Sequence, residues 1–497
     1  MPFLLLFLLA LVCLPDSWPQ PLAWIGVSEG NPFVFAAATW GGVAAFGFWA
    51  FITAQRASFL IRIPQRRDAA LGKLGRSRRW HFSLLSLFLV VSVYLLGWGW
   101  TVEQFATFRG ELIPGAELFV LAPYLFGLVI SWLAFYDADL AAHDTSLLHH
   151  RSEFFSRWSY VSFHLRQKLA LIIAPLLLLI FDKGLRRIVP EPHWQIQIAS
   201  AFFLLAIVFL GLPWILRIAL GLASLPDGEL RNRLEQTARR LNFRCTDILL
   251  WNTHGAIANA MVAGFLPWLR YVLLTDRLIS ELTPDEVEAV FGHEIGHVKH
   301  RHMYFYLGFL LISLLVVAGL WNLTAAHFLA QQPSLADPRT ASAMGDLELL
   351  PLVMLSGGYI FLVFGFLSRR CERQADIFGC RTVSCQRPDC TGHDDGTPLA
   401  PNADGLCPTG INTFISALEK VAAINGISRH KPGWLQSWQH STIARRVEFL
   451  QDVLQDFSIE RRFQRTVFWV KSTLLAILVA AFVMLGQSQG WQALGFF

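Results

Sequence analysis

Apolar stretches of membrane-spanning length are the feature that most constrains how this 497-residue chain can fold. A bilayer is crossed by about 20 consecutive apolar residues, and spanning segments must satisfy their own backbone hydrogen bonds, which favours helices. Hydrophobic residues make up 54% of the sequence and charged residues 15%, against about 45–50% and about 25% in soluble domains. We therefore predict a multi-pass α-helical membrane protein. The predicted spans are Phe33–Thr53, Phe82–Trp100, Leu118–Phe135, Leu169–Phe181, Ile196–Ala219, Met303–Leu323, Leu350–Leu367 and Phe468–Leu485.

The first residues form a further apolar stretch. Met1–Leu14 is only about as long as the apolar region of a signal peptide, and no basic residue precedes it. We interpret it as a short first membrane segment, with a cleaved signal peptide as the alternative.

Basic residues between the predicted spans indicate the orientation, because short loops rich in Lys and Arg stay in the cytoplasm. Residues 54–81 carry eight Arg and Lys residues, whereas residues 101–117 carry three Glu and one Arg. We expect an integral membrane protein, in the inner membrane if the cell is bacterial, with residues 282–300 and 368–376 on the cytoplasmic side. Lys183, Arg186 and Arg187 are discordant with this scheme. The net charge of +5 is too small to indicate nucleic-acid binding.

The stretch from Leu282 to His300 has the pattern of a helix start. Thr283 is a good N-cap, Pro284 suits the first helical position, and Glu286 completes a Thr-x-x-Glu capping box. Within this predicted helix, residues 293–297 read His-Glu-Ile-Gly-His, an H-E-x-x-H motif.

Histidines four residues apart lie on one face of a helix, so His293 and His297 can reach one metal ion. Glu294 is rotated by about 100° around the helix axis, which suits a base acting on metal-bound water better than a third ligand. We predict a catalytic Zn2+ here. The alternative is a chance pattern in a histidine-containing helix.

Catalytic zinc usually has three protein ligands and a water molecule, so a third ligand is needed. Ser368–Asp376 contains an E-x-x-x-D pattern on a predicted helix. Glu372 is the predicted carboxylate ligand. Asp376, one turn later, is predicted to accept a hydrogen bond from a ligating imidazole and to fix its tautomer. Taken alone, this pair would be typical of a solvated helix face.

Together these motifs resemble the M48 family of membrane zinc metallopeptidases, which includes the Ste24-type CAAX proteases and the HtpX-type quality-control proteases. The resemblance extends over about residues 225–450. Asn259, Ala260 and Gly264 are similar to the family's N-A-x-x-x-G segment. His302 is similar to an extra histidine of Ste24-like members, although we expect His300 and His302 to be surface or interfacial histidines and not ligands.

The family's H-P-x-x-x-x-R segment has a counterpart between His440 and Arg446, where Ser441 replaces the usual proline. The resemblance implies that His440 or Arg446 stabilises the oxyanion formed during peptide hydrolysis. It also implies an α+β, zincin-like (gluzincin) catalytic domain, at the cytoplasmic face of the membrane.

Between Leu225 and Ser280 the pattern becomes that of a soluble domain. An amphipathic helix is predicted over residues 229–241, followed by strands over Asp247–Trp251, Ile257–Phe265 and Tyr271–Thr275. An edge strand can bind an extended peptide through its backbone. We expect Asn259 and Ala260 to bind substrate in this way, with a plain core strand as the alternative.

A cysteine cluster follows the second motif. In a reducing cytoplasm, closely spaced Cys and His residues bind metal more often than they form disulfides. Two interpretations stay open, a second, structural zinc site and a loop rich in turn residues. The cluster consists of Cys380, Cys385, Cys390, His393 and Cys407.

The predicted organisation alternates membrane and catalytic parts. Two membrane helices separate the two halves of the catalytic domain, so the metal should lie near the membrane surface. The predicted parts are an N-terminal membrane domain (1–222), the first part of the catalytic domain (223–302), two membrane helices (303–367), the second part with the Cys-rich insertion (368–465) and a C-terminal membrane helix (466–497).

We predict a membrane-embedded zinc endopeptidase that cleaves membrane-associated or misfolded membrane proteins. A CAAX-type processing protease is the alternative within this class. A site-2-type intramembrane protease is disfavoured, because Asp285, Glu286 and Glu288 are too polar for a helix in lipid. A transporter or scaffold with a non-catalytic metal site is the alternative of another class, and the motif residues do not exclude a non-peptide hydrolase.

Overall fold

The computed structural model describes residues 30–108, 111–113, 115–145, 154–188, 194–331, 349–385, 405–430 and 441–489, with a few positions before residue 22. The chain divides into two compact units. One consists of Met1–Leu204 with Trp321–Leu355, and the other of Leu205–Leu320 with Ser356–Phe497. Most of the predicted segment Met1–Leu14 lies outside the described residues.

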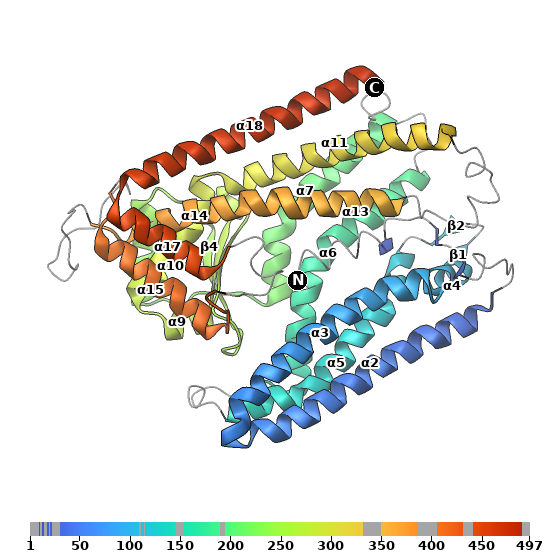
Figure 1. Cartoon of the computed structure of the whole chain (residues 1–497), viewed down its shortest axis with the longest axis horizontal. Coiled ribbons are helices and arrows are strands. Elements are labelled where there is room, and N and C mark those ends of the chain that lie inside the picture. The colour runs from blue at the N-terminus through green and yellow to red at the C-terminus, as the bar shows by residue number, and fades with distance from the viewer. Residues whose placement is uncertain are drawn as a thin grey trace. The chain divides into compact units, whose positions relative to one another are not determined.

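The first unit is a helical bundle (Figure 1). Ala50, Ala54 and Ala57 of α2 pack with Ala138 and Ala141 of α5, and such small side chains let two helix backbones approach closely. The described elements are α2 (Pro32–Ile61), η2 (Pro64–Arg66), α3 (Arg67–Tyr94), α4 (Trp98–Phe105), β1 (Thr107–Phe108), β2 (Glu111–Leu112), α5 (Ala116–Asp144), α6 (Arg157–Ile188) and the start of α7 (Trp194–Leu220).

Two predicted spans differ from the structure. The span predicted over Phe82–Trp100 is two helices, because α3 ends at Tyr94 and the chain turns by 55° before α4. Gly97 provides the turn with a φ of +71°, a backbone conformation that other residues rarely adopt. The short span Leu169–Phe181 lies within the longer α6, which bends by 55° before Pro175. Proline lacks the N–H that a straight helix requires.

Five described helices are long and apolar enough to cross a membrane, or up to seven spans if each bent pair counts as one. They include α2, α5 and α18 (Ser458–Gln489). The others are α11 (His302–Gln331) and the run formed by α13 (Leu349–Tyr359), the π-helical turn η6 (Ile360–Phe364) and α14 (Gly365–Thr382). The prediction of a mostly helical, multi-pass protein is thereby confirmed.

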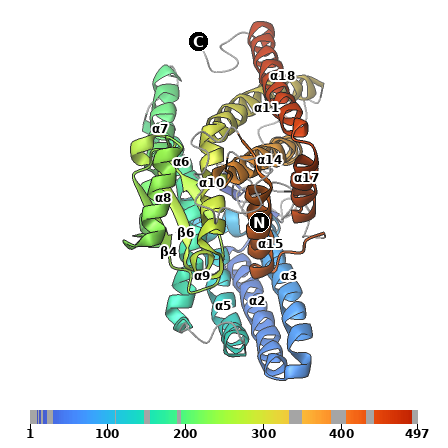
Figure 2. The ribbon, with the colours of Figure 1, turned by 90° about the vertical axis from the view of Figure 1, so that its left-hand side faces the viewer.

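The second unit contains a four-stranded sheet with the order β3-β4-β6-β5 (Figure 2). Strand β4 (Asp247–Trp251) runs parallel to β6 (Tyr271–Thr275), and β3 (Ala223–Ser224) and β5 (Ala260–Ala263) pair antiparallel at the two edges. The strands predicted over Asp247–Trp251 and Tyr271–Thr275 have the predicted bounds, and the middle one is shorter than predicted.

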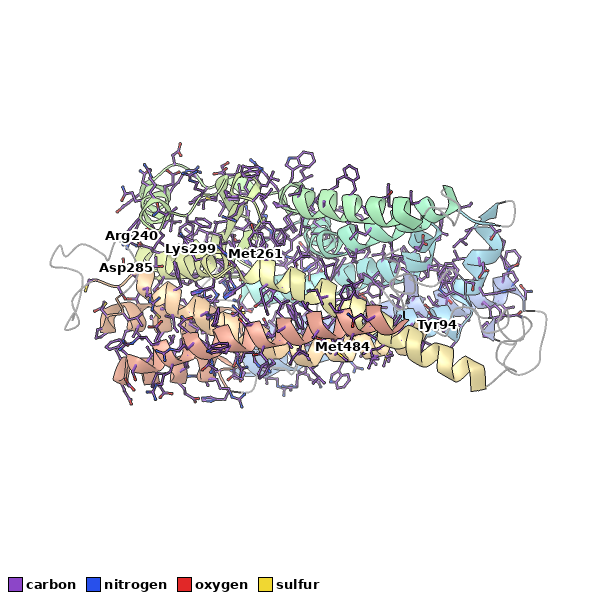
Figure 3. The ribbon with its side chains drawn as sticks, turned by 90° about the horizontal axis from the view of Figure 1, so that it is seen from above. Tyr94, Arg240, Met261, Asp285, Lys299 and Met484 are labelled. Atoms are coloured by element: carbon purple, nitrogen blue, oxygen red, sulfur yellow. The ribbon has the colours of Figure 1, made fainter. Side chains whose placement is uncertain are left out.

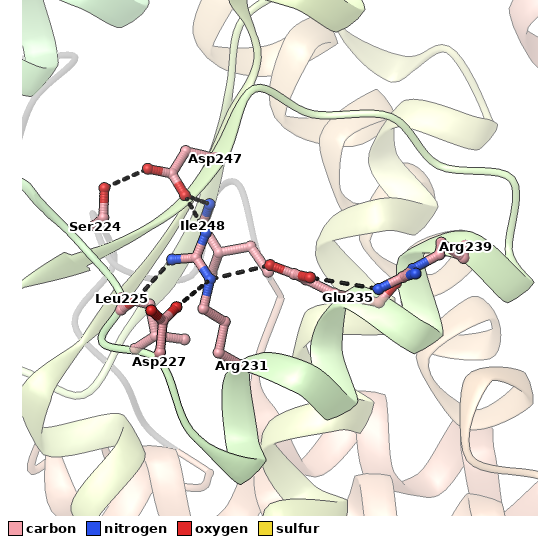
Figure 4. Close-up of polar contacts among 8 residues, drawn as sticks. All are labelled: Ser224, Leu225, Asp227, Arg231, Glu235, Arg239, Asp247 and Ile248. Carbon is pink, nitrogen blue, oxygen red and sulfur yellow. Dashed lines mark hydrogen bonds and ion pairs between the residues drawn. The ribbon is translucent and has the colours of Figure 1, made fainter.

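An arginine of α8 (Glu229–Arg240) fixes this helix to the sheet (Figure 4). Arg231 donates to Asp247 on β4 at 2.9 Å, to Glu235 at 3.0 Å and to the carbonyl oxygen of Leu225 at 2.6 Å. Ser224 of β3 donates to the other carboxylate oxygen of Asp247 at 2.5 Å. One ion-pair network therefore joins the helix and two strands.

Helix α10 (Pro284–Lys299) lies between the sheet and a group of C-terminal helices. Phe291 and Ile295 pack with Val272 and Leu274 of β6. Ala289 packs with α15 (Pro408–Ile424) and α17 (Ile443–Gln455). The buried Glu288 accepts hydrogen bonds from Arg233, Thr237 and Arg240 of α8. The remaining helices are η3 (Pro267–Leu269) and α9 (Asp276–Glu281).

Candidate metal centre

The start of α10 has the predicted capping box. The Glu286 backbone N–H donates to Thr283 Oγ1 at 3.3 Å, and the Thr283 N–H donates to Glu286 Oε2 at 2.9 Å. Pro284 occupies the first turn. This cap fixes where α10 begins, and Figure 3 labels Asp285 in its first turn and Lys299 at its end.

Two glycines let α10 approach α14 closely. A Cβ atom at Gly292 would lie 2.2 Å from Thr382 Oγ1, and one at Gly296 would lie 2.9 Å from the Cβ atom of Phe378. Both distances are below those of real Cβ contacts, so any larger residue would force the two helices to shift. This contact brings the H-E-x-x-H face of α10 against the face of α14 that carries Glu372.

Three side chains converge between these helices. The Nε2 atoms of His293 and His297 lie 3.3 Å apart, and Glu372 carboxylate oxygens lie 3.8 Å and 3.6 Å from them, respectively. Zn–N bonds of about 2.0–2.1 Å in a tetrahedral site imply about 3.3 Å between ligand atoms. Two imidazoles and a carboxylate at these separations fit zinc. Within the described part of the chain, they are the one group of three or more metal-binding side chains.

Asp376 contacts His293, and Arg446 contacts both Asp376 and Glu372. His293 Nδ1 lies 3.0 Å from Asp376 Oδ1, and Asp376 is completely buried. Arg446 donates to Asp376 through Nε at 2.8 Å and also through an Nη atom, and its other Nη atom lies 3.7 Å from Glu372. Burial lowers the pKa of His293. The carboxylates of Asp376, Glu372 and Glu294 outweigh this effect, so the pKa of His293 lies above its usual value. Arg446 thus orients two carboxylates, while its predicted oxyanion contact stays a prediction.

Glu294 faces the edge strand of the sheet. The Val262 N–H of β5 donates to Glu294 Oε2 at 3.1 Å. Asn259, in contrast, exchanges hydrogen bonds with Thr275, because its N–H donates to the Thr275 hydroxyl and its carbonyl accepts the Thr275 N–H. Backbone groups alternate in direction along a strand, so Ala260 and Val262 present theirs to the free edge beside Glu294.

The expectation that His302 is a surface or interfacial histidine is wrong, because its side chain is completely buried. Its Nδ1 lies 2.9 Å from Nδ1 of His297, and its Nε2 lies 3.1 Å from Gln374 Oε1. Lys471 of α18 donates to the same Gln374 oxygen at 2.9 Å. Sequence spacing did not indicate this contact, because the turn at Arg301, with a φ of +54°, ends the course of α10 and His302 begins a new helix.

The remaining predicted residues are only partly described. His440, Cys390 and His393 lie outside the described residues. Cys380, Cys385 and Cys407 are buried, and Cys385 packs against Cys407. The second metal site stays a prediction.

The structure is a mostly helical, multi-pass protein in which both histidines of an H-E-x-x-H motif converge with Glu372. Residues 224–393 match the model of Peptidase family M48, and the chain therefore carries a Peptidase M48 domain. A CAAX prenyl protease 1 homolog of Arabidopsis thaliana is 27% identical over 220 residues, which cover 42% of this chain and 50% of the relative. A Protease HtpX homolog of Thermoplasma acidophilum is 27% identical over 152 residues, or 30% and 44% of the two chains.

The chain spans about half the length of these two curated relatives. Among solved structures, Ste24p from S. mikatae superposes over 84% of this chain and 98% of its own, with a TM-score of 0.44 and 16% sequence identity.

Proposed function

We propose that the protein is a membrane-embedded zinc endopeptidase. The observation that carries this proposal is the convergence of His293, His297 and Glu372 beside Glu294, which faces the free edge of a β-strand. The sheet, α10 and α14 support a zincin-like catalytic domain. The match to Peptidase family M48 supports the same reaction class.

The residues divide the chemistry between them. His293, His297 and Glu372 would hold Zn2+, which when bound polarises a scissile carbonyl group and acidifies a water molecule. Glu294 takes the proton of the attacking water and later delivers it to the leaving amine nitrogen. Asp376, held by Arg446, keeps the imidazole of His293 in the tautomer whose Nε2 is free to ligate.

Substrate would bind as an added strand along β5. Its backbone would pair with Ala260 and with the carbonyl oxygen of Val262, whose N–H donates to Glu294, and this places a scissile bond next to Glu294. Because these hydrogen bonds join backbone groups, substrates of many different sequences can bind. Digestion of damaged proteins requires this tolerance. Asn259 would contribute its side chain alone.

The location proposed for the centre is the cytoplasmic membrane surface. His297 is followed within a few residues by the apolar α11, and the apolar run ending near Leu367 precedes Glu372. Substrates would be membrane-associated or misfolded membrane proteins. CAAX-type processing is a second candidate, favoured by the similarity to the Arabidopsis thaliana CAAX prenyl protease 1 homolog over 220 residues.

The test compares the purified wild type with Glu294→Gln in detergent. Casein and an unfolded membrane protein are the substrates, and a prenylated CAAX peptide is included to separate the two candidates. We expect cleavage by the wild type and none by Glu294→Gln, because the amide cannot accept a proton. Glu281→Gln, an exposed position on α9, is the matched control. Equal cleavage by Glu294→Gln and the wild type would overturn the proposal.

A further inference from the structure

A cavity of about 230 Å³ that is lined by four arginines lies in the second unit. Three of its arginines lie on two adjacent turns of α14, and a fourth lies on α17. Side chains of α18 and a hydroxyl before α17 complete it. The lining residues are Arg369, Arg370, Arg373, Ser441, Arg445, Phe463 and Thr466.

Arg370, Arg373 and Arg445 differ in their charge partners from other arginines on the same helices. Arg381 of α14 pairs with Glu460 at 2.5 Å, and Arg446 of α17 pairs with Asp376. In contrast, no carboxylate among the described residues lies within ion-pair distance of Arg370, Arg373 or Arg445. Four arginines thus line one cavity, and such a cluster favours an anion.

The charges of the cavity repel one another across two helices. Arg445 of α17 repels both Arg369 and Arg373 of α14, and at Arg373 the nearby Asp376 opposes this repulsion. Arg370 lies over the ring of Phe366, with its guanidinium carbon 3.6 Å from the ring centroid. An anion bound in the cavity would remove this repulsion and link α14 to α17.

Exposed apolar side chains lie close in sequence to the residues that line the cavity on α14 and α18. Leu362 of η6 and Phe366 of α14 precede the arginines and are 70% and 41% exposed. On α18, Phe468 and Trp469 follow Thr466 and are 62% and 64% exposed. Tryptophan is typical of the membrane interface, and exposed leucine and phenylalanine of its apolar side. The cavity therefore lies at the level where phospholipid headgroups begin.

We propose that this cavity binds the phosphate group of an anionic phospholipid. Arginine binds phosphate oxygens through paired N–H groups, and the Ser441 and Thr466 hydroxyls supply further donors. The acyl chains would run along Phe366, Leu362 and Phe468. A free phosphate ion offers the same oxygens but gains nothing from these apolar residues, so we commit to the lipid.

Binding would stabilise the arrangement of the catalytic helices. Helix α14 carries Glu372 and Asp376, and α17 carries Arg446, which joins them. A phosphate between Arg373 and Arg445 links the residues that directly follow Glu372 and precede Arg446 in the sequence. An anionic lipid should therefore raise the unfolding temperature of the full-length protein.

The test is thermal unfolding of the delipidated full chain in detergent. Phosphatidylglycerol, phosphatidylcholine or inorganic phosphate is added, and tryptophan fluorescence reports unfolding. The pocket variant is Arg369→Gln/Arg445→Gln. The control variant is Arg461→Gln/Arg465→Gln, which removes the same charge from exposed positions of α18 that do not line the cavity.

We expect phosphatidylglycerol to raise the unfolding temperature of the wild type and the control alike, and that of the pocket variant by less than half as much. Loss of two charged hydrogen-bond donors corresponds to lipid binding about tenfold weaker or more. Equal shifts in all three proteins would overturn the proposal, and so would a full shift with inorganic phosphate or phosphatidylcholine. If the double variant does not fold, Arg445→Gln alone should show a reduced shift, and an undiminished shift overturns the proposal.

Discussion

His302 Nδ1 lies 2.9 Å from Nδ1 of His297, and His302 is in turn held by Gln374. Partners behind a metal-binding imidazole fix the orientation of its ring, and their loss typically costs about 10–100-fold in metal affinity. His302 is therefore a positioning residue for the proposed zinc site.

Replacing His302 by Ala should weaken zinc binding about 10–100-fold, because the His297 ring loses its partner. Titration of the metal-free protein with zinc in competition with a chelator measures this effect directly. His254→Gln, at an exposed position before β5, should bind zinc like the wild type. Unchanged zinc affinity of His302→Ala would exclude a positioning role.

The close contact of α10 and α14 predicts the effect of a single methyl group. Gly292→Ala would place a Cβ atom 2.2 Å from Thr382 Oγ1, and overpacking of this kind costs about 1–3 kcal/mol of unfolding free energy. Zinc affinity should fall as well, because the helices that supply the ligands move apart. Thermal unfolding and zinc titration measure the two effects.

Two further variants make this prediction specific. Gly308→Ala in α11 is the control, since a Cβ atom there meets nothing within 4 Å. Adding Thr382→Ala to Gly292→Ala removes the hydroxyl and methyl groups that lie 2.2 Å and 2.8 Å from the added Cβ atom but keeps the Cβ atom of residue 382 at 2.5 Å, so only part of the stability should return. A Gly292→Ala protein as stable as Gly308→Ala would contradict the close packing.

A buried carboxylate at the start of α10 predicts a pH dependence of stability. Burial raises the pKa of Glu286, but hydrogen bonds from Lys420, Ser416 and the Thr283 backbone outweigh it, so the pKa lies below its usual value. The stabilisation is fully present above the unfolded pKa of about 4.3 and is lost as the pH falls through the lowered folded value.

Glu286→Gln should therefore destabilise the protein by about 1 kcal/mol at neutral pH. The difference between variant and wild type should shrink as the pH falls below the pKa of the unfolded carboxyl group. Urea unfolding in detergent at a series of pH values measures this, with the exposed Glu281→Gln as the control. A difference that grows towards acid pH would show the opposite sign and refute the assignment.

The sequence predicted those parts of the site that local patterns encode. The capping box at Thr283 and the spacing of His293 and His297 depend on one helix alone, and the structure contains both. Apolar stretches likewise predicted α2, α5 and α18, because length and composition define a membrane helix. The strands β4 and β6 also have their predicted bounds.

Contacts between distant segments were not predictable in this way. The burial of His302 against Gln374 depends on how α11 packs on α14, and spacing in the sequence does not encode this packing. The break at Gly97 was missed because the apolar composition continues through it. The arginine cavity needs three helices, of which the sequence indicates only the charges.

The central claim is that His293, His297 and Glu372 hold one catalytic zinc ion. The most direct test is the zinc content of the purified full-length wild type, Glu294→Gln and Glu372→Gln, determined by elemental analysis after dialysis. The account predicts about one zinc per chain for the wild type and Glu294→Gln, since one set of three ligands holds a catalytic ion, and loss of zinc from Glu372→Gln. Full zinc content in Glu372→Gln, or none in the wild type, would contradict it.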